Sequence, residues 1–281
     1  MERKINQLSK KAHYLRELVL DMCIKAKTGH LTSSFSCVEI LVALYYGGIL
    51  KYKVSQSKWA RRDRFILSKG HASPLLYTVL SDLGFFPKEE LFKFAQREGK
   101  FGVHLQNDVP GVEITSGSLG QGLGVGAGLA LAFKKDKKPY KVFVLLGDGE
   151  CYEGSIWEAV MFSSHHNLNN LIAIVDRNFL CVTDFTEKIV KFEPLEKKWE
   201  GFGWEVKRVD GHSFKELLSV LERRRLDKLK RPLVVIADTV KGKGISFIEN
   251  KPLWHGIAPT KEKEIKRARE ELRRRKLNDE E

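Results

Sequence analysis

Short apolar runs alternate with helix-type segments along most of this chain, and that alternation limits its fold more than any other feature. The runs at 142–146, 171–175 and 233–237 contain only Val, Ile, Leu, Phe and Ala, which is typical of strands buried on both faces. Segments with apolar residues three and four positions apart follow at 156–166 and 213–225. Strands joined through helices form parallel sheets, so we expect an α/β fold, a parallel sheet flanked by helices.

The rest of the pattern predicts further elements. The chain opens with an amphipathic stretch from Ile5 to Met22, and Ser36 precedes Glu39 by three residues, the spacing of a capping box. Seven glycines lie between residues 111 and 128, where we expect the backbone to approach another group closely. The other expected elements are helices at 37–46, 73–84 and 129–135 and strands at 64–67 and 205–209.

No repeat or Pro/Ser-rich linker divides the chain, so we expect one domain at 1–260 and a charged helix or tail at 261–281. Hydrophobic residues make up 42% of the 281 positions, which is ordinary for a folded protein. No apolar run reaches the roughly 18 residues that a membrane helix needs, and the charged first residues resemble no secretory signal. We therefore expect a cytoplasmic protein without a membrane partner.

The net charge of +13 raises the question of a nucleic-acid partner. Glutamates are interspersed in the basic stretches at 222–231 and 261–276, as on solvated helix faces with i,i+4 pairs. No nucleic-acid-binding motif is present. We expect no nucleic-acid partner, and anionic small molecules such as sugar phosphates explain the positive balance at least as well.

Polar residues follow two successive strands of the expected sheet. Gly147-Asp148-Gly149 comes directly after one strand, and Asn178 follows the next, 30 residues later. In parallel sheets, ligands bind at the carboxyl ends of the strands, so the two side-chain oxygens can converge. Mg²⁺ takes one or two protein ligands and completes its shell with phosphate oxygens and water. The residues alone therefore suggest a Mg²⁺ that holds a diphosphate.

The spacing of these residues resembles the thiamine diphosphate signature, and other segments extend the resemblance over nearly the whole chain. In their order, these segments resemble transketolase, so the thiamine diphosphate-binding fold of that family is implied. The matching segments are Lys27–His30, Asp63–His71, Gly117–Gly122, Asp210–His212 and Trp254–Gly256.

The resemblance implies how a metal and the cofactor are held. Asp148, Asn178 and the backbone carbonyl of Leu180 match the ligands of Mg²⁺, or of Ca²⁺ or Mn²⁺ in its place. Gly149 matches an amide that faces the diphosphate. The segment Gly117, Ser118 and Leu119 matches residues that touch the rings of the cofactor.

Four of the eight histidines lie in or beside matching motifs, and the resemblance implies that they are catalytic. His71 and His255 match histidines near the diphosphate and thiazolium, and His30 and His104 match histidines that contact sugar hydroxyls. Proton transfer near neutral pH suits histidine. Glu153 matches an acidic residue near the subunit interface, and we expect it to take part in catalysis and in cofactor binding. We assign no catalytic role to the others, His13, His165, His166 and His212.

The resemblance covers only the first part of full-length transketolases. The family's catalytic glutamate and its phosphate-binding arginines lie on a second domain that has no match here. The resemblance therefore implies the N-terminal subunit of a split transketolase, in an α2β2 assembly with a C-terminal, pyrimidine-binding subunit. Its reaction would transfer a two-carbon ketol unit from a ketose phosphate to an aldose phosphate, as in the pentose phosphate pathway.

Other functions stay open from the sequence. They are a 1-deoxyxylulose-5-phosphate synthase-like enzyme, a split transketolase for an unusual sugar, and a non-catalytic module that only binds the cofactor. Dehydrogenase E1 subunits share the Gly-Asp-Gly signature, but the surrounding histidine pattern does not match theirs. Several positions also depart from the family pattern. Thr32-Ser33-Ser34 stands where glycines are usual, and Phe179 stands where glycine is common, so the backbone there must suit a side chain. Cys181 and Cys151-Tyr152 are further departures.

Overall fold

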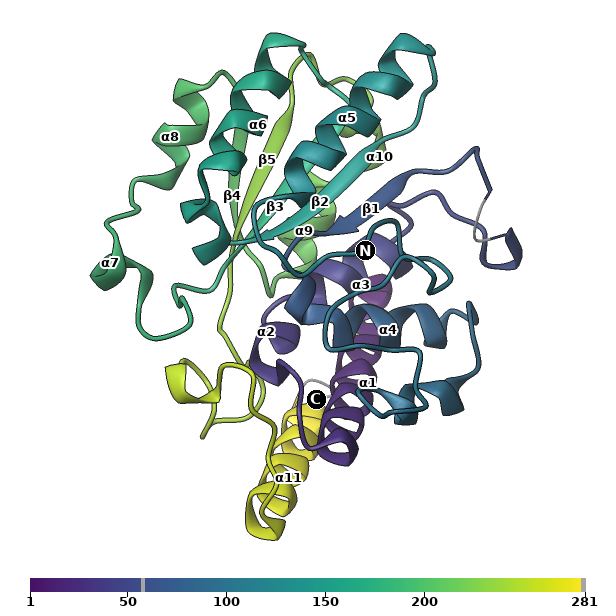
Figure 1. Ribbon diagram of the computed structural model, residues 1–281, viewed down its shortest axis with the longest axis vertical. Helices are drawn as coiled ribbons and strands as arrows, with labels where there is room; N and C mark the ends of the chain where they lie inside the picture. Colours follow the sequence, from purple (N-terminus) through teal and green to yellow (C-terminus); the bar gives the residue numbers. More distant parts are fainter. Residues whose placement is uncertain (57–58, 279–281) are drawn as a thin grey trace.

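A computed structural model, which describes residues 1–56 and 59–278, shows a parallel five-stranded sheet between two layers of helices (Figure 1). All neighbouring strands pair in parallel, in the order β1-β2-β3-β5-β4, so the predicted fold class is confirmed. The strands are β1 (Arg64–Leu67), β2 (Val142–Gly147), β3 (Leu171–Arg177), β4 (Glu205–Asp210) and β5 (Leu233–Asp238).

The central strands are apolar throughout because both of their faces are buried. In β2, Phe143 and Leu145 belong to one hydrophobic core, while Val142, Val144 and Leu146 belong to the other. The same alternation occurs in β3 and β5. Each strand therefore contributes to two cores, as the period-2 geometry of a strand requires.

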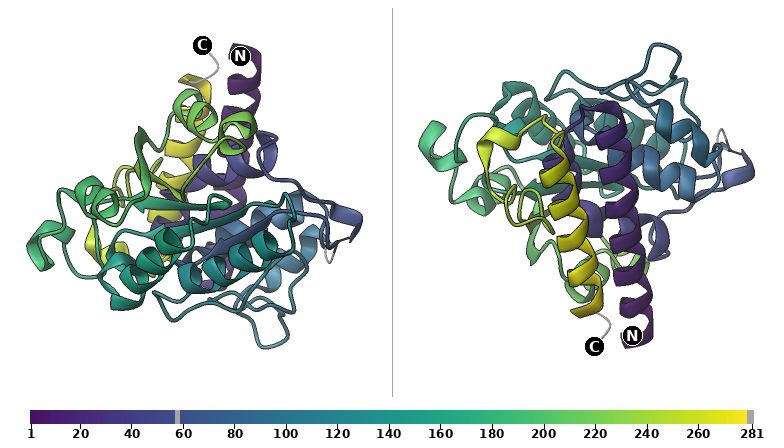
Figure 2. Two further views of the ribbon diagram at one scale, coloured as in Figure 1. Left: turned by 90° about the horizontal axis from the view of Figure 1, so that it is seen from above. Right: turned by 90° about the horizontal axis from the view of Figure 1, so that it is seen from below.

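Helices cover the two faces in separate layers, which are visible edge-on in the left view of Figure 2. The larger core contains buried residues of α1 (Glu2–Ala26), α2 (Leu31–Phe35), α3 (Val38–Tyr46), α4 (Ser73–Asp82), α9 (Phe214–Val220), α10 (Arg223–Leu226) and α11 (Glu262–Asn278). The smaller core contains those of α5 (Gly122–Lys135), α6 (Gly154–His165) and α8 (Leu195–Gly201). A short helix, α7 (Thr186–Ile189), follows β3, and 3₁₀ turns lie at Val54–Gln56, Gly70–Ala72, Lys88–Lys93, Gly149–Tyr152 and Pro252–Trp254.

The predicted capping box at the start of α3 is wrong. Ser36 does not cap the helix; its hydroxyl lies 2.6 Å from Asp176 Oδ2, on β3. The Glu39 carboxylate instead accepts hydrogen bonds from both terminal nitrogens of Arg16. Both side chains are buried, and at buried positions long-range polar partners took the place of the local cap.

The glycine-rich segment enters a helix earlier than predicted. Helix α5 begins at Gly122 instead of residue 129, so glycines of this segment lie inside it. A Cβ atom at Gly126 would lie 2.6 Å from Val144 Cγ2 of β2. This glycine therefore allows the helix backbone to pack closely on the sheet, a tertiary requirement that overrides helix propensity.

The predicted helix at 213–225 is two helices, α9 and α10, with a break at Leu221 and Glu222. Leu221 and Leu226 are both buried in the larger core. Five positions apart on one straight helix, they would point about 140° away from each other. The break lets both leucines reach the same core.

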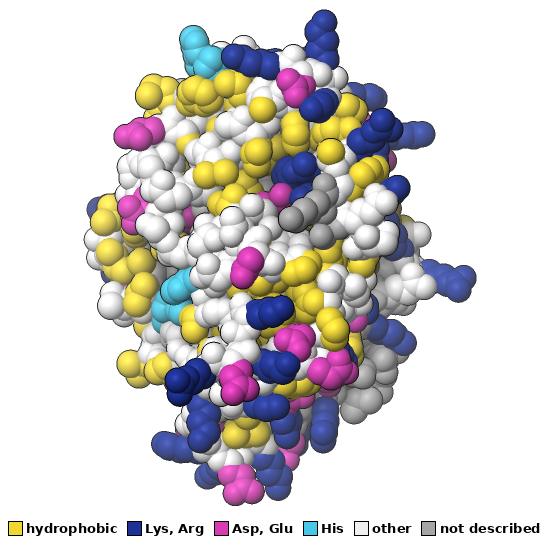
Figure 3. Space-filling model, turned by 45° about the vertical axis from the view of Figure 1, so that its right-hand side comes forward, with side chains coloured by type: hydrophobic (Ala, Val, Ile, Leu, Met, Phe, Trp, Pro, Cys, Tyr) yellow, Lys and Arg dark blue, Asp and Glu magenta, His cyan; other side chains and the backbone are white. Residues whose placement is uncertain are grey.

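The charged C-terminal segment forms α11, which lies beside α1 with both chain ends at the same end of the pair (Figure 2, right). Ala268 and Leu272 bury one face of α11. Lys and Arg side chains are spread over the face in Figure 3, with Asp and Glu among them at the lower end. On this face the positive charge is therefore dispersed. Within the described residues, no helix has the length and hydrophobicity that crossing a membrane requires.

Candidate cofactor and substrate site

The two predicted metal-binding residues lie at neighbouring strand ends. Gly147 of β2 pairs with Asp176 of β3, so Asp148 and Asn178 follow at the same edge of the sheet. The Phe179 amide donates to Asp148 Oδ2 at 2.6 Å, and the Gly149 amide donates to Asp148 Oδ1 at 2.8 Å. Asp148 therefore contacts the residue next to Asn178, and the two residues lie at one edge of the sheet, as the parallel topology requires.

Asp148 is a buried carboxylate in a strongly polar environment. Its relative exposure is 1%, and Arg177 Nη1 lies 3.0 Å from Oδ2. Burial, followed by the charge of Asp176, raises the pKa of Asp148 above its usual value. A divalent cation at this carboxylate would oppose both effects, because a nearby positive charge favours the ionised form.

Asn178 is held by hydrogen bonds at both ends of its side-chain amide. Its Nδ2 lies 3.3 Å from the Asp176 carbonyl and 3.4 Å from Asp176 Oδ2, while Oδ1 accepts from the Leu180 amide at 3.2 Å. The described residues contain no cluster of three or more His, Cys, Asp or Glu that could hold a metal ion. The predicted set is of another type, with one carboxylate, one amide oxygen and one carbonyl, and it relies on phosphate and water for the remaining ligands.

Phe179 adopts the backbone conformation that its position demands. Its φ is 64°, in the left-handed region that favours glycine. The hydrogen bond from its amide to Asp148 and the Arg177 guanidinium 4.2 Å from its ring centroid hold it there. The departure from glycine thus leaves the Asp148 contact intact, with backbone strain that these contacts offset.

The four predicted histidines come together from four separate segments. His30 precedes α2, His71 lies in the turn after β1, His104 lies in a long loop, and His255 follows the turn at Pro252–Trp254. The His30 ring centroid lies 5.2 Å from those of His71 and His255 and 6.1 Å from that of His104. No sequence proximity joins these residues, so the fold itself forms the cluster.

Burial and neighbouring positive charges keep three of these histidines neutral near pH 7. Burial and the nearby His104 lower the pKa of His30 to about 4, and burial and Lys241 lower the pKa of His255 to about 3. Burial, followed by Lys69, also lowers the pKa of His71 well below 6.5. A neutral imidazole offers one donor and one acceptor nitrogen, so these rings can both bind hydroxyl groups and transfer protons.

These shifts predict that folding stability decreases with acidification from pH 7 to pH 5. Between pH 6.5 and pH 4 the unfolded chain binds protons that folded His30 does not, so acid favours unfolding. His30 alone contributes on the order of 1–2 kcal/mol over this range. Urea unfolding at several pH values should show a smaller decrease for His30→Gln than for the unchanged chain. The control is exposed His165→Gln, and an unchanged slope in His30→Gln contradicts the assignment.

The other predicted residues lie around this cluster in one loop and one helix start. Gly117 packs against the His104 ring, since a Cβ there would lie 3.2 Å from His104 Cγ. Ser118 and Leu119 lie in the same loop, and neither of them is buried. Glu153 precedes α6 and is exposed, with its side chain beside Gly120, so it does not join the histidines.

A buried ion pair that the sequence did not single out lies under the site. Lys69 and Asp176 are 1% and 0% exposed, and the Lys69 ammonium pairs with Asp176 Oδ2 and donates to the Ser33 carbonyl at 2.9 Å. Thr239 also donates to Asp176. Asp176 is a polar residue at the end of the apolar run of β3, and that was a usable signal in the sequence. Its partner Lys69 lies 107 positions away, so no local pattern links the two residues.

Glu150 and Lys241 are the other polar groups that sequence reasoning missed. Glu150 accepts from the amides of Gly120 and Gly147 at 2.9 and 3.0 Å, which joins the 117–120 loop to the end of β2. Lys241 is 4% exposed, and burial, followed by Lys69, lowers its pKa to about 8. Lys241 is therefore a buried cation of the site, and it interacts with the carboxylates of Asp148 and Asp176.

These residues fit thiamine diphosphate and a divalent cation. The buried Nδ1 atoms of His30 and His255 and the buried Ser33 hydroxyl have no hydrogen-bond partner among the described residues. Buried polar atoms without a protein partner are usually satisfied by water, an ion or a ligand, so these three atoms can bind a polar group. The buried cation Lys241 lies close enough to Asp148 and Asp176 to interact electrostatically with both. The site therefore offers a cation for a diphosphate, oxygens for a metal and ring nitrogens for a polar substrate.

Fold and site together define an α/β cofactor-binding domain whose polar site lies at the carboxyl edge of its sheet. Comparison with known families narrows this class. The family described as transketolase, thiamine diphosphate binding domain, matches residues 7–276, and this chain belongs to that family.

Two relatives match over nearly their whole length. An apulose-4-phosphate transketolase subunit of Phocaeicola vulgatus is 38% identical over 91% of this chain and 90% of its own. The 6-deoxy-6-sulfo-D-fructose transketolase subunit SqwG of a Clostridium species is 39% identical over 91% of this chain and 92% of its own. By contrast, the transketolase of Pongo abelii is 39% identical, but the match covers 40% of that protein.

Solved structures agree with this membership. Transketolase from Campylobacter jejuni superposes with a TM-score of 0.86 at 32% identity, over 97% of this chain and 45% of that one. The Pichia stipitis enzyme in complex with sedoheptulose 7-phosphate gives a TM-score of 0.86 at 30% identity, over 96% of this chain and 41% of that one. This chain thus spans less than half the length of these two transketolases.

Proposed function

We propose that this chain is the N-terminal subunit of a split transketolase. With thiamine diphosphate and Mg²⁺, and with a separate C-terminal subunit, it transfers a two-carbon ketol unit from a ketose phosphate to an aldose phosphate. The observation that carries this proposal is the histidine cluster, in which two buried nitrogens lack partners among the described residues. Relatives named as transketolase subunits, matched over 90% and 92% of their length, support the split.

Each part of the site has a distinct task in this proposal. Asp148, Asn178 and the Leu180 carbonyl would hold the cation, and the Gly149 amide and Lys241 would add positive potential for the diphosphate. His71 and His255 would serve the cofactor, and His30 and His104 would bind hydroxyl groups of the sugar. Bound thiamine diphosphate supplies an electron sink for the carbanion left when the ketose is cleaved between C2 and C3.

The histidines supply what that chemistry requires of this chain. Cleavage between C2 and C3 releases an aldehyde, so the proton of the C3 hydroxyl must be removed. Neutral imidazoles can accept and return that proton within the cluster.

The chain lacks a match for the family's catalytic glutamate and phosphate-binding arginines, so we propose that the partner supplies them. An α2β2 assembly in the cytoplasm is part of this proposal. We assign Glu153 to an interface between subunits, and its exposure at the start of α6 supports this assignment. The domain boundary we propose, a cofactor-binding domain at 1–260 followed by an appended helix, belongs to the same proposal.

A split transketolase for an unusual sugar is a second candidate function. The two subunit relatives are named for apulose 4-phosphate and 6-deoxy-6-sulfo-D-fructose, neither of which is an ordinary pentose phosphate. Thr32, Ser33 and Ser34 follow His30 closely in sequence where glycines are usual, and all three are buried. The donor therefore has to be determined by assay.

We expect affinity capture from native extract, with thiamine diphosphate and Mg²⁺ present, to retain a second chain of comparable size. Neither chain alone should transfer ketol units at full rate, and the reconstituted pair should use xylulose 5-phosphate or another ketose as donor. Preference for pyruvate indicates a 1-deoxyxylulose-5-phosphate synthase-like enzyme instead. Full activity of the purified chain alone contradicts the split, and cofactor binding without any partner or activity favours a binding module.

A further inference from the structure

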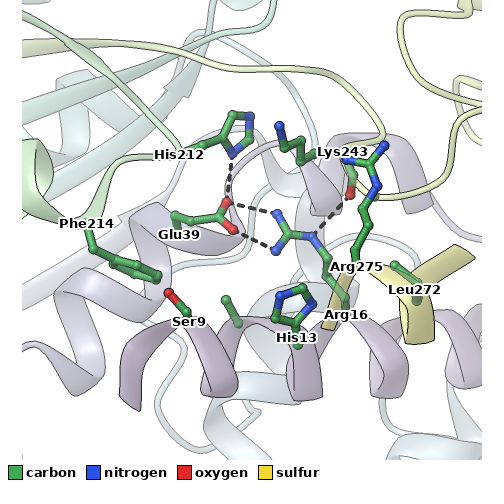
Figure 4. A pocket seen from close by; sticks show the side chains of 11 residues that line it. Ser9, His13, Arg16, Glu39, His212, Phe214, Lys243, Leu272 and Arg275 are labelled. Carbon is green, nitrogen blue, oxygen red and sulfur yellow. Dashed lines mark hydrogen bonds and ion pairs between the residues drawn. The ribbon is translucent and has the colours of Figure 1, made fainter. Parts of the chain in front are cut away.

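A second pocket lies apart from the histidine cluster, between α1, α3, α11 and the turn at Lys243 and Gly244 (Figure 4). Its volume is about 470 Å³, within the range of small-molecule sites. None of the four clustered histidines lines it. The proposed reaction gives this pocket no task.

The floor of the pocket is a buried network of charged groups. Arg16 donates to both carboxylate oxygens of Glu39, at 2.6 and 2.8 Å, and His212 Nδ1 lies 2.8 Å from Glu39 Oε2. Arg16 and Glu39 are 4% and 7% exposed. Because both of its oxygens are already bonded, Glu39 does not compete for cations elsewhere in the pocket.

The walls add positive charge that the floor does not balance. Lys243, in the turn after β5, and Arg275, on α11, both line the pocket (Figure 4). Arg275 pairs with Glu249 at 2.9 Å, outside the lining residues, whereas Lys243 has no ion-pair partner within residues 1–56 and 59–278. Lys243 therefore supplies an uncompensated charge to a pocket that a guanidinium group also lines, and this combination suits a dianion.

We propose that this pocket binds a small phosphate-bearing anion. Lys243 and Arg275, which both line the pocket, neutralise its charge. The ligand class is a phosphate monoester or free phosphate, since the shared chemistry of the two is a compact dianion.

The pocket is connected to the candidate cofactor site through one short turn. Arg16 Nε donates to the Lys243 carbonyl at 3.1 Å, and the Val240 amide donates to His212 Nε2 at 2.8 Å. Lys241, between these two anchors, is the buried cation of the cofactor site. An anion that moves the turn therefore changes the position of Lys241, so binding at the two sites is coupled and reciprocal. This coupling rests on the proposed function, whereas anion binding does not.

Calorimetric titration of the full chain without cofactor tests the anion site, with inorganic phosphate and glycerol 3-phosphate as probes. We expect saturable binding, with Kd raised at least about tenfold in Lys243→Gln and in Arg275→Gln. Exposed Lys230→Gln and Arg224→Gln are the matched controls and should bind as the unchanged chain does. Tighter binding of glycerol 3-phosphate identifies a phosphate ester as the ligand, and the reverse order identifies free phosphate.

Three results overturn the anion site. The first is the absence of saturable binding. The second is an equal loss of phosphate affinity in the two control variants, which indicates diffuse surface charge. The third is a loss of affinity in Lys241→Gln with none in Lys243→Gln, which places the anion in the cofactor site. Thermal unfolding of each variant shows whether a lost signal reflects a lost fold.

The coupling is tested by titrating thiamine diphosphate with Mg²⁺ in the presence and absence of saturating glycerol 3-phosphate. We expect the cofactor Kd to change at least about threefold, and the change to disappear in Lys243→Gln. An equal Kd under both conditions overturns the coupling while the anion site stands. Failure of the cofactor to bind at all overturns the coupling and the proposed function together, and leaves the phosphate titration as an independent result.

Discussion

Replacing Asp148 by Asn is expected to raise the Kd of thiamine diphosphate in the presence of Mg²⁺ by roughly 100-fold. The substitution keeps the size of the side chain and an oxygen that can accept from the Phe179 amide. It removes the negative charge that a divalent cation needs at a site whose other two ligands are neutral oxygens. Tryptophan fluorescence or calorimetry, with Mg²⁺ varied at fixed cofactor, measures the effect.

The metal dependence separates this effect from general damage. Without Mg²⁺, the variant and the unchanged chain should bind the cofactor equally weakly, because the missing charge then has no cation to hold. Asp136→Asn, an exposed aspartate after α5, is the matched control and should leave the Kd unchanged. Unaltered Mg²⁺-dependent binding in Asp148→Asn would remove Asp148 from the metal site.

Replacing Asp176 by Asn is expected to destabilise the fold by about 3–5 kcal/mol. The carboxylate is the ionic partner of Lys69, and neither side chain is exposed to solvent by more than 1%. Burial alone would raise the pKa of Asp176, but the charge of Lys69 and the hydrogen bonds from Ser36 and Thr239 hold that pKa below its usual value. Without this charge, the buried Lys69 ammonium keeps the Ser33 carbonyl as an acceptor but has no counter-ion. Urea unfolding at pH 7 measures the loss.

Removal of both charges tests the cause of this loss. The double substitution Lys69→Met and Asp176→Leu removes both members of this ion pair, so it should be less destabilising than Asp176→Asn alone. The exposed pair of Lys138 and Asp136 supplies the control, since Asp136→Asn should cost less than about 1 kcal/mol. A double variant that is as unstable as the sum of two single variants contradicts the ion-pair explanation.

The sequence determined the fold class and the layered core because each strand and most helices carry a strong local pattern. The runs at 142–146 and 171–175 are apolar at every position, which only strands covered on both faces require. Asp148 and Asn178 could likewise be placed at one edge of the sheet, because parallel strands all end on the same side. The four histidines were assigned to one site through the resemblance of their sequence motifs to the family. The periodicity of the sequence did not predict that they lie together.

Tertiary structure alone decided the features that depend on partners distant in sequence. Ser36 bonds to Asp176 instead of capping a helix, Gly126 lies inside a helix because β2 is close, and Lys69 reaches Asp176 across 107 positions. Local patterns carry only preferences of a few tenths to about 1 kcal/mol. An unpaired buried charge or an overlapping atom costs more, so packing overrides local preference where the two conflict. The low pKa values of the histidines have the same origin, because burial and neighbouring cations exist only in the folded chain.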